Sequence, residues 1–156
     1  GKESLQKWFA AGGDYVGLAH GGSAVDFAVD AGLADVQYGY ISGNAIVKVA
    51  YDPDDSVAAG FLEHGYAFVN RSAWFTDQGD DMRVSARLEN SDAFLLSGYW
   101  ENWQYSGAQG LPIIVHGENG EEGRQDTVLI GIDATFSGHP EDSFRIIGIA
   151  IYTGLD

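Results

Sequence analysis

The feature that most constrains this chain is a short apolar stretch that runs into a glycine-rich turn, with a helical pattern directly after it. Tyr15–Ala19 is apolar, as in a buried strand. Gly21 and Gly22 follow at the turn, and helical spacing continues over Ala24–Val29. In open α/β folds, ligands and nucleophiles lie at such strand-to-helix turns. The sequence therefore predicts an α/β domain with a candidate site at this turn.

Composition limits the class of protein. The chain has 156 residues, of which 45% are hydrophobic, and this suits a single domain with a real core. Eight Lys and Arg residues stand against 23 Asp and Glu, for a formal net charge of -15. Nucleic acids and anionic membranes require clustered basic residues, so the charge argues against both as partners. Cys is absent, which excludes disulfides, Cys-type zinc sites and a Cys nucleophile.

Hydrophobic spacing predicts the order of elements. A first helix is expected after Ser4, ending at Gly12 and Gly13. Asp35–Ile41 and Ala45–Tyr51 alternate as strands around a turn, and we expect an inserted antiparallel hairpin. A short helical piece over 57–62, an aromatic-rich connection over Ser72–Phe75 and a largely buried final helix after Pro140 are also expected. The other predicted strands cover Tyr66–Val69, Met82–Leu88, Ala93–Ser97, Pro112–His116 and Thr127–Ile132.

These elements predict a flavodoxin-like three-layer sandwich with a mainly parallel central sheet. Thr127–Ile132 is almost continuously apolar, as central parallel strands are. A helix before the first strand indicates that the first strand of the full fold is missing. We therefore expect residues 1–156 to be one domain within a longer chain. The sheet edge exposed in this way is a candidate contact between two copies, as in a homodimer.

Two stretches resemble class I glutamine amidotransferase-like domains. Gly12–Gly21 is similar to their nucleophile elbow, in which a strand leads into Gly-x-Cys-x-Gly. Phe136–Glu141 is similar to their Phe-His-Pro-Glu segment, with two extra residues after Phe136. The resemblance places the family's Cys at Ala19, and its His and Glu at His139 and Glu141.

A closer resemblance is to the amidotransferase-like domain found C-terminal to some secreted bacterial zinc carboxypeptidases of the carboxypeptidase A type. It implies that the chain is an appendage of a metallopeptidase, with zinc held only in an upstream domain. It also implies an extracellular or periplasmic location, and the peptidase domain of the same polypeptide as partner. The motifs that carry it are Val47–Pro53, Leu96–Tyr99, Gly117–Gly123 and Leu129–Glu141.

The histidines agree with a role outside the zinc centre. A carboxypeptidase zinc site needs His-x-x-Glu and a distant His. None of the four histidines has Glu three residues later, so we expect no metal site and no cofactor in this chain. The four are His20, His64, His116 and His139.

The candidate site residues have competing interpretations. Ala19 cannot be a nucleophile, because a methyl group has no lone pair. His20, Gly21 and Gly22 lie beside a helix N-terminus and suit an anion, or they simply form a turn. His139 and Glu141 are the remnant of a triad, or the capped start of a helix.

The aromatic cluster is the other candidate binding region. Trp100 and Trp103, with Trp74, Phe75 and Tyr105, suit stacking on a sugar or peptide, docking to a peptidase domain, or core packing. Asp52, Asp54 and Asp55 carry oxygens of the kind that calcium prefers, but a capped turn is the simpler interpretation.

Three functional hypotheses remain. The first is a non-catalytic accessory domain, a pseudoenzyme that docks, binds or stabilises. The second is a hydrolase that uses His20, His139 and Glu141. The third is a carbohydrate- or peptide-binding module that uses exposed Trp residues, Trp100 and Trp103 above all. Ligand and oligomeric state are not determined by these patterns.

Overall fold

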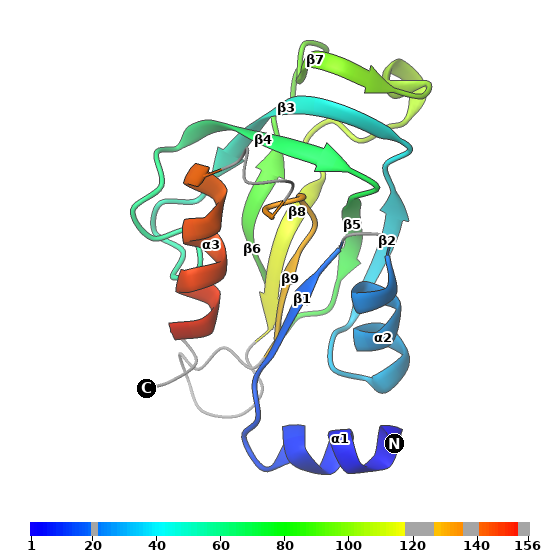
Figure 1. The fold of residues 1–156 in the computed structure, drawn as a ribbon, viewed down its shortest axis with the longest axis vertical. Helices are drawn as coiled ribbons and strands as arrows, with labels where there is room; N and C mark the ends of the chain where they lie inside the picture. Colours follow the sequence, from blue (N-terminus) through cyan, green and yellow to red (C-terminus); the bar gives the residue numbers. More distant parts are fainter. Residues whose placement is uncertain (20–21, 118–126, 136–140, 153–156) are drawn as a thin grey trace.

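The computed structural model describes residues 1–19, 22–117, 127–135 and 141–152. In this part of the chain, a seven-stranded sheet is accompanied by a two-stranded sheet and three α-helices (Figure 1). The helices are α1 (Lys2–Ala10), α2 (Ser23–Ala31) and α3 (Glu141–Tyr152), with a 3-10 turn η1 (Trp103–Tyr105). The strands are β1 (Tyr15–Leu18), β2 (Val36–Tyr40), β3 (Gly43–Tyr51), β4 (His64–Asn70), β5 (Ala73–Gln78), β6 (Met82–Leu88), β7 (Leu95–Trp100), β8 (Pro112–Gly117) and β9 (Thr127–Ile130).

The large sheet is mixed, so the expectation of a mainly parallel sheet is wrong. Its order is β1-β9-β8-β6-β3-β4, and β7 pairs with β3. Only β1 and β9 pair in parallel among the described strands, and the remaining pairs are antiparallel. The apolar run in β9 reflects burial on both faces, since Val128 packs in one apolar cluster and Leu129 in the other. Hydrophobic periodicity indicates such burial, but it does not distinguish parallel from antiparallel strands.

The predicted hairpin over 35–51 is also wrong, although both of its strands exist. β2 pairs with β5, through Tyr38 and Phe75 among others, and lies in the small sheet. β3 instead pairs with β4 and β7 in the large sheet. The two strands bury their apolar residues in different clusters, Val36 in one and Val47 in the other, so they separate after Tyr40.

The two faces of the large sheet carry separate apolar clusters, which gives three layers. Neighbouring residues of a strand point to opposite faces, and Ile114 and Val115 accordingly fall in different clusters. Ile146 of α3 packs in the cluster of Ile114, and Val25 of α2 packs in that of Val115. The three-layer prediction is therefore confirmed, with α3 on one face and α2 with the small sheet on the other.

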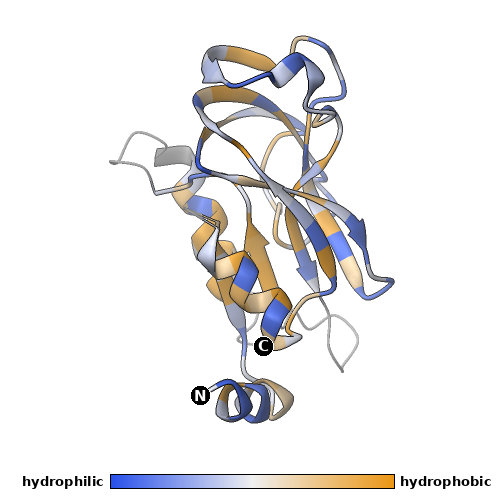
Figure 2. Cartoon of the chain, turned by 90° about the vertical axis from the view of Figure 1, so that its right-hand side faces the viewer, coloured by the Kyte–Doolittle hydropathy of each residue, from blue (hydrophilic) through white to orange (hydrophobic). Residues whose placement is uncertain are grey.

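The helices follow the sequence prediction unevenly. α2 ends before Gly32, whose φ of 72° is the left-handed conformation that glycine adopts readily. α1 has no buried residue and lies at one end of the molecule (Figures 1 and 2). α3 is only half buried: Ile146 is 1% exposed, whereas Ile151 is 50% exposed, so the expectation of a largely buried helix is wrong. No described helix is long and apolar enough to cross a membrane.

Two local predictions also need correction. Residues 57–60 form a turn and residues 61–62 are irregular, in place of a helical piece, and Gly60 has a φ of 78°. The aromatic connection around Trp74 is the strand β5, with Ala73 and Phe75 buried. β1 has β9 as its one partner strand among the described residues, and a missing first strand remains a prediction.

Candidate functional site

The described part of the strand-to-helix turn, Ala19 and Gly22, carries no reactive side chain. The Ala19 N–H donates to the Ile130 carbonyl at 3.0 Å, and the Gly22 N–H donates to the Ala19 carbonyl at 3.2 Å. The Ala19 methyl is fully buried and packs with Val25 and Leu129. This position therefore lacks both a nucleophilic atom and access to a substrate. His20 and Gly21 lie outside the described residues, and their anion-binding role stays a prediction.

Gly22 serves as the N-cap of α2 in a conformation that favours glycine. Its φ is 86°, and a Cβ there would lie 2.5 Å from the ring of Tyr40. The Tyr40 hydroxyl donates to the Gly22 carbonyl at 3.2 Å and to Asp26 Oδ1 at 2.6 Å. Tyr38 donates to the same oxygen at 2.6 Å, and these two hydrogen bonds lower the pKa of Asp26. The tyrosines therefore brace the first turn of α2 against the small sheet.

The triad remnant expected at His139 and Glu141 stays a prediction. His139 lies outside the described residues, and Glu141 begins α3 with a side chain that also lies outside them. The parallel pairing of β1 and β9 does place the carboxyl ends of both strands at one edge of the sheet.

The three tryptophans of the aromatic cluster, Trp74, Trp100 and Trp103, pack against the core. Trp100 is 3% exposed, stacks on Trp74 with ring centroids 5.8 Å apart, and meets Phe94 edge-on at 5.3 Å. Trp103 is partly buried and also packs edge-on against Phe94, at 5.6 Å. Burial leaves almost none of the Trp100 ring for a ligand. The exposed aromatic residues nearby are Tyr99 and Tyr105, at 64% and 86% exposure.

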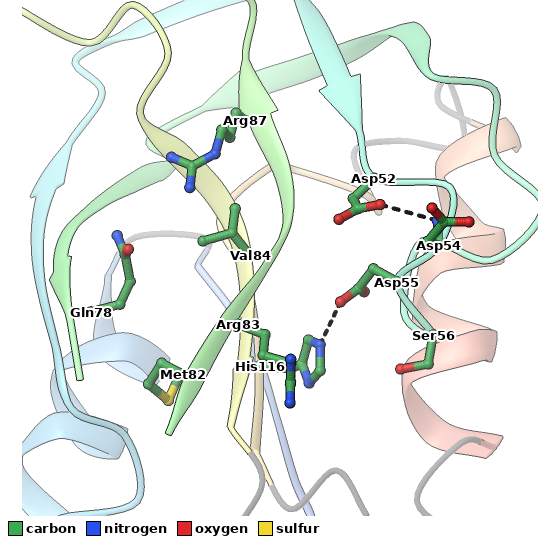
Figure 3. A pocket seen from close by; sticks show the side chains of 10 residues that line it. All are labelled: Asp52, Asp54, Asp55, Ser56, Gln78, Met82, Arg83, Val84, Arg87 and His116. Atoms are coloured by element: carbon green, nitrogen blue, oxygen red, sulfur yellow. Dashed lines mark hydrogen bonds and ion pairs between the residues drawn. The ribbon is translucent and has the colours of Figure 1, made fainter. Parts of the chain in front are cut away.

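A buried Asp–His pair is the most developed polar arrangement in the described part of the chain. His116 Nε2 lies 2.7 Å from Asp55 Oδ2, with the two side chains 1% and 7% exposed (Figure 3). Asp55 Oδ1 also accepts the N–H groups of Val57 and Ala58, at 3.0 and 3.4 Å. Burial alone raises the pKa of Asp55, but the His116 hydrogen bond and charge outweigh it, and the pKa lies below the usual range. Asp55 is therefore ionised at neutral pH.

Ser85 brings a third residue type of a hydrolase triad to this pair. The β6–β8 register shifts around Ser85, and this bulge turns a fully buried hydroxyl toward the Asp55 side. The hydroxyl helps to lower the pKa of Asp55, although it forms no hydrogen bond of ordinary geometry among the described residues. In a working triad the histidine lies between serine and aspartate. Here the carboxylate is the central group, so His116 is not placed to activate Ser85.

Sequence patterns indicate only half of this arrangement. They predict Asp55 in a capped turn, and the turn hydrogen bonds confirm that. His116 is, by sequence, only one of four histidines without a zinc motif. The two residues are 61 positions apart, and no local signal joins them. Their contact depends on the register between β6 and β8, which pairs Arg83 with His116.

Comparisons with known proteins bear on the fold alone. No protein-family model and no curated protein sequence matches the chain. A putative GMP synthase protein from Thermoplasma acidophilum superposes over 96% of this chain, with a TM-score of 0.57 and 10% identity. A putative ThuA-like protein from Bacteroides uniformis superposes over 98%, with a TM-score of 0.60 and 13% identity. The fold is thus glutamine amidotransferase-like, and the chain spans 64% and 62% of these two proteins.

Proposed function

We propose that this chain is a non-catalytic amidotransferase-like accessory domain of a secreted zinc carboxypeptidase. The observation that carries the first part is Ala19, a buried methyl group at the position where the resemblance expects the nucleophile. The second part rests on the motifs that resemble carboxypeptidase appendages. In this proposal zinc belongs to the upstream peptidase domain, the protein is extracellular or periplasmic, and this chain contributes docking and stability.

An exposed sheet face is the surface we assign to docking. Residues of β3 alternate between the core and solvent, and the outward ones pair with outward residues of β4 and β7. Ile46 is 41% exposed, Tyr66 is 63% exposed and Tyr99 is 64% exposed. β7 and β3 lie at one end of the molecule and carry hydrophobic stretches there (Figure 2). We call Ile46, Tyr66 and Tyr99 the outer aromatic face.

Such a face suits the peptidase domain of the same polypeptide. Exposed tyrosines with an aliphatic neighbour are typical of interface centres, because they bury much area at little entropic cost. A glycan would stack on the same tyrosine rings. The binding experiment below distinguishes a glycan from the peptidase domain. The buried Trp100 cannot serve either partner directly.

A glutaminase assay tests the non-catalytic claim. The purified chain should release no ammonia from glutamine above the buffer rate, and His139→Ala should leave that result unchanged. A measurable rate that disappears in His139→Ala would overturn the claim. It would instead favour the hydrolase that uses His20, His139 and Glu141.

A binding experiment with the separate peptidase domain tests the docking claim. That domain, expressed from the parent reading frame, should bind this chain in calorimetry, and Tyr66→Ser with Tyr99→Ser should weaken binding at least about tenfold. Tyr105→Ser is the matched control, because Tyr105 is exposed but lies outside the outer aromatic face. Binding of a glycan array with no binding of the peptidase domain would replace the docking claim.

A further inference from the structure

A pocket lies where β3 leaves β6. β3 pairs with β6 through Val49, Ala50 and Tyr51, and the chain turns away after Asp52, whose N–H still donates to the Ser85 carbonyl at 2.9 Å. The earlier part of β6 continues beside β8 alone among the described strands. The pocket between this part of β6 and the departing loop has a volume of about 580 Å³, within the range of small-molecule sites.

Opposite charges line the two sides of this pocket. Figure 3 shows Asp52 and Asp54 on one side and Arg87 on the other. Within the described part of the chain, none of these three side chains forms an ion pair. The Asp54 N–H donates to Asp52 Oδ1 at 3.0 Å, and Arg87 Nη1 donates to the Gly110 carbonyl at 3.3 Å. Asp52 and Arg87 are therefore oriented by backbone groups while their charges stay available.

The position of Arg87 is unusual for this chain. Only eight Lys and Arg residues face 23 Asp and Glu, yet Arg83 and Arg87 both line this one pocket. A basic residue at a concave site, with acidic residues opposite, suits a ligand that carries both charges. A plain anion would be repelled by the carboxylates, and a plain cation by the guanidinium groups.

His116 adds a second, independent indication of a ligand. It lines the same pocket between Arg83 and Asp55, and its side chain is 1% exposed. Nε2 is engaged by Asp55, whereas Nδ1 has no hydrogen-bond partner among the described residues. A buried polar atom without a partner is costly, and such atoms in folded proteins commonly await a water or a ligand.

We propose that this pocket binds a small zwitterion of amino-acid to dipeptide size. Its ammonium group lies against Asp52 and Asp54, and its carboxylate lies against Arg87, whose planar guanidinium suits a carboxylate. The site is separated from the β1 turn by β8 and β9, so it stands independently of the accessory role proposed above.

Ligand-observed NMR with three matched probes tests this proposal. The probes are the dipeptide alanylalanine, its C-terminal amide and its N-acetyl derivative, each titrated against the whole chain. The dipeptide should bind in the millimolar range, and each singly charged probe should bind about two- to fivefold more weakly, as for loss of one solvent-exposed charge pair. Equal affinity for all three, or no binding of the dipeptide, would overturn the proposal.

Two variants assign the charges to the two ends of the ligand. Arg87→Gln should remove the preference for the dipeptide over its amide while keeping the preference over the N-acetyl form. Asp54→Asn should weaken the second preference and keep the first. Lys48→Gln, on the outward side of β3, is the control and should change neither. Because Arg87 and Asp54 are exposed, both variants should fold, and circular dichroism checks this. Retention of both preferences in both variants would place binding elsewhere.

Discussion

His116 Nε2 lies 2.7 Å from Asp55 Oδ2, and this contact ties the turn after β3 to the strand β8. The carboxylate also accepts backbone N–H groups of its own turn, so one side chain connects a loop to the sheet. Removal of either partner leaves a buried polar group without its complement.

His116→Leu should therefore destabilise the protein. Loss of the hydrogen-bond partner of a buried carboxylate typically costs about 3 kcal/mol, because the charge of Asp55 stays buried without its partner. Urea denaturation should show this decrease in the free energy of unfolding. His64→Leu is the matched control at an exposed histidine and should change the free energy by less than about 0.5 kcal/mol. Equal effects of the two substitutions would mean that the pair contributes little.

Acid should weaken the fold through Asp55. Its pKa is lower in the folded protein than the usual value, which is about 4 for an unfolded chain. The contribution to stability is therefore complete above about pH 4 and is lost as the pH falls through the folded pKa. Thermal melts between neutral and strongly acidic pH should show a steeper loss in wild type than in Asp55→Asn. Parallel curves for the two proteins would exclude Asp55 as the source.

Ala19→Cys should produce an unreactive thiol in the folded protein. The chain has no cysteine, so the new thiol is the only one, and the Ala19 side chain is fully buried. Reaction with a chromogenic thiol reagent should be slow until denaturant is added. Ser97→Cys, at an exposed position of β7, should react at once. Rapid labelling of Ala19→Cys would show that the elbow opens to solvent and would weaken the non-catalytic argument.

Trp100→Ala should lower the free energy of unfolding, because Trp100 serves the core and not a ligand. Its ring is buried against Trp74 and Phe94, and truncation of a buried aromatic side chain costs about 3–5 kcal/mol. Tyr105→Ala, at an exposed ring, should stay within about 0.5 kcal/mol of wild type. A stable Trp100→Ala protein with impaired sugar binding would restore the tryptophan-platform hypothesis.

Gly22→Ala should destabilise more than Gly32→Ala. Both glycines have positive φ, which costs an alanine about 1–2 kcal/mol. At Gly22 the new methyl group would also meet the Tyr40 ring, whereas at Gly32 it would enter open space. Comparison of the two melting temperatures isolates the Tyr40 contact. Equal losses would mean that the ring moves aside freely.

Local patterns predict the elements that depend on neighbouring residues. α2 and its end at Gly32, the strand before it, and the capped turn at Asp55 follow from periodicity, glycine and side-chain capping. β5 carries a usable signal, because Trp74 and Phe75 are strong β-formers bounded by turn residues. Interpreting it as a connection hides its pairing to β2.

Strand direction and long-range pairing lie beyond those patterns. The apolar run of β9 indicates burial, but such a run does not specify the direction of the neighbouring strands. In the structure, β9 is parallel to β1 and antiparallel to β8. Likewise, the sequence does not specify whether the Trp100 ring lies on the surface or in the core. Only its packing against Trp74 and Phe94 shows that it lies in the core.

The sequence by itself determined that this is a three-layer α/β domain, and that the position where the resemblance expects a nucleophile is Ala19, because burial periodicity and the identity of a residue are local properties. Only the tertiary structure decided that the sheet is mixed, that Asp55 meets His116, and that Asp54 and Arg87 face one pocket. Those facts depend on the register of strands far apart in the chain, and a side chain's chemistry alone does not specify its distant neighbour.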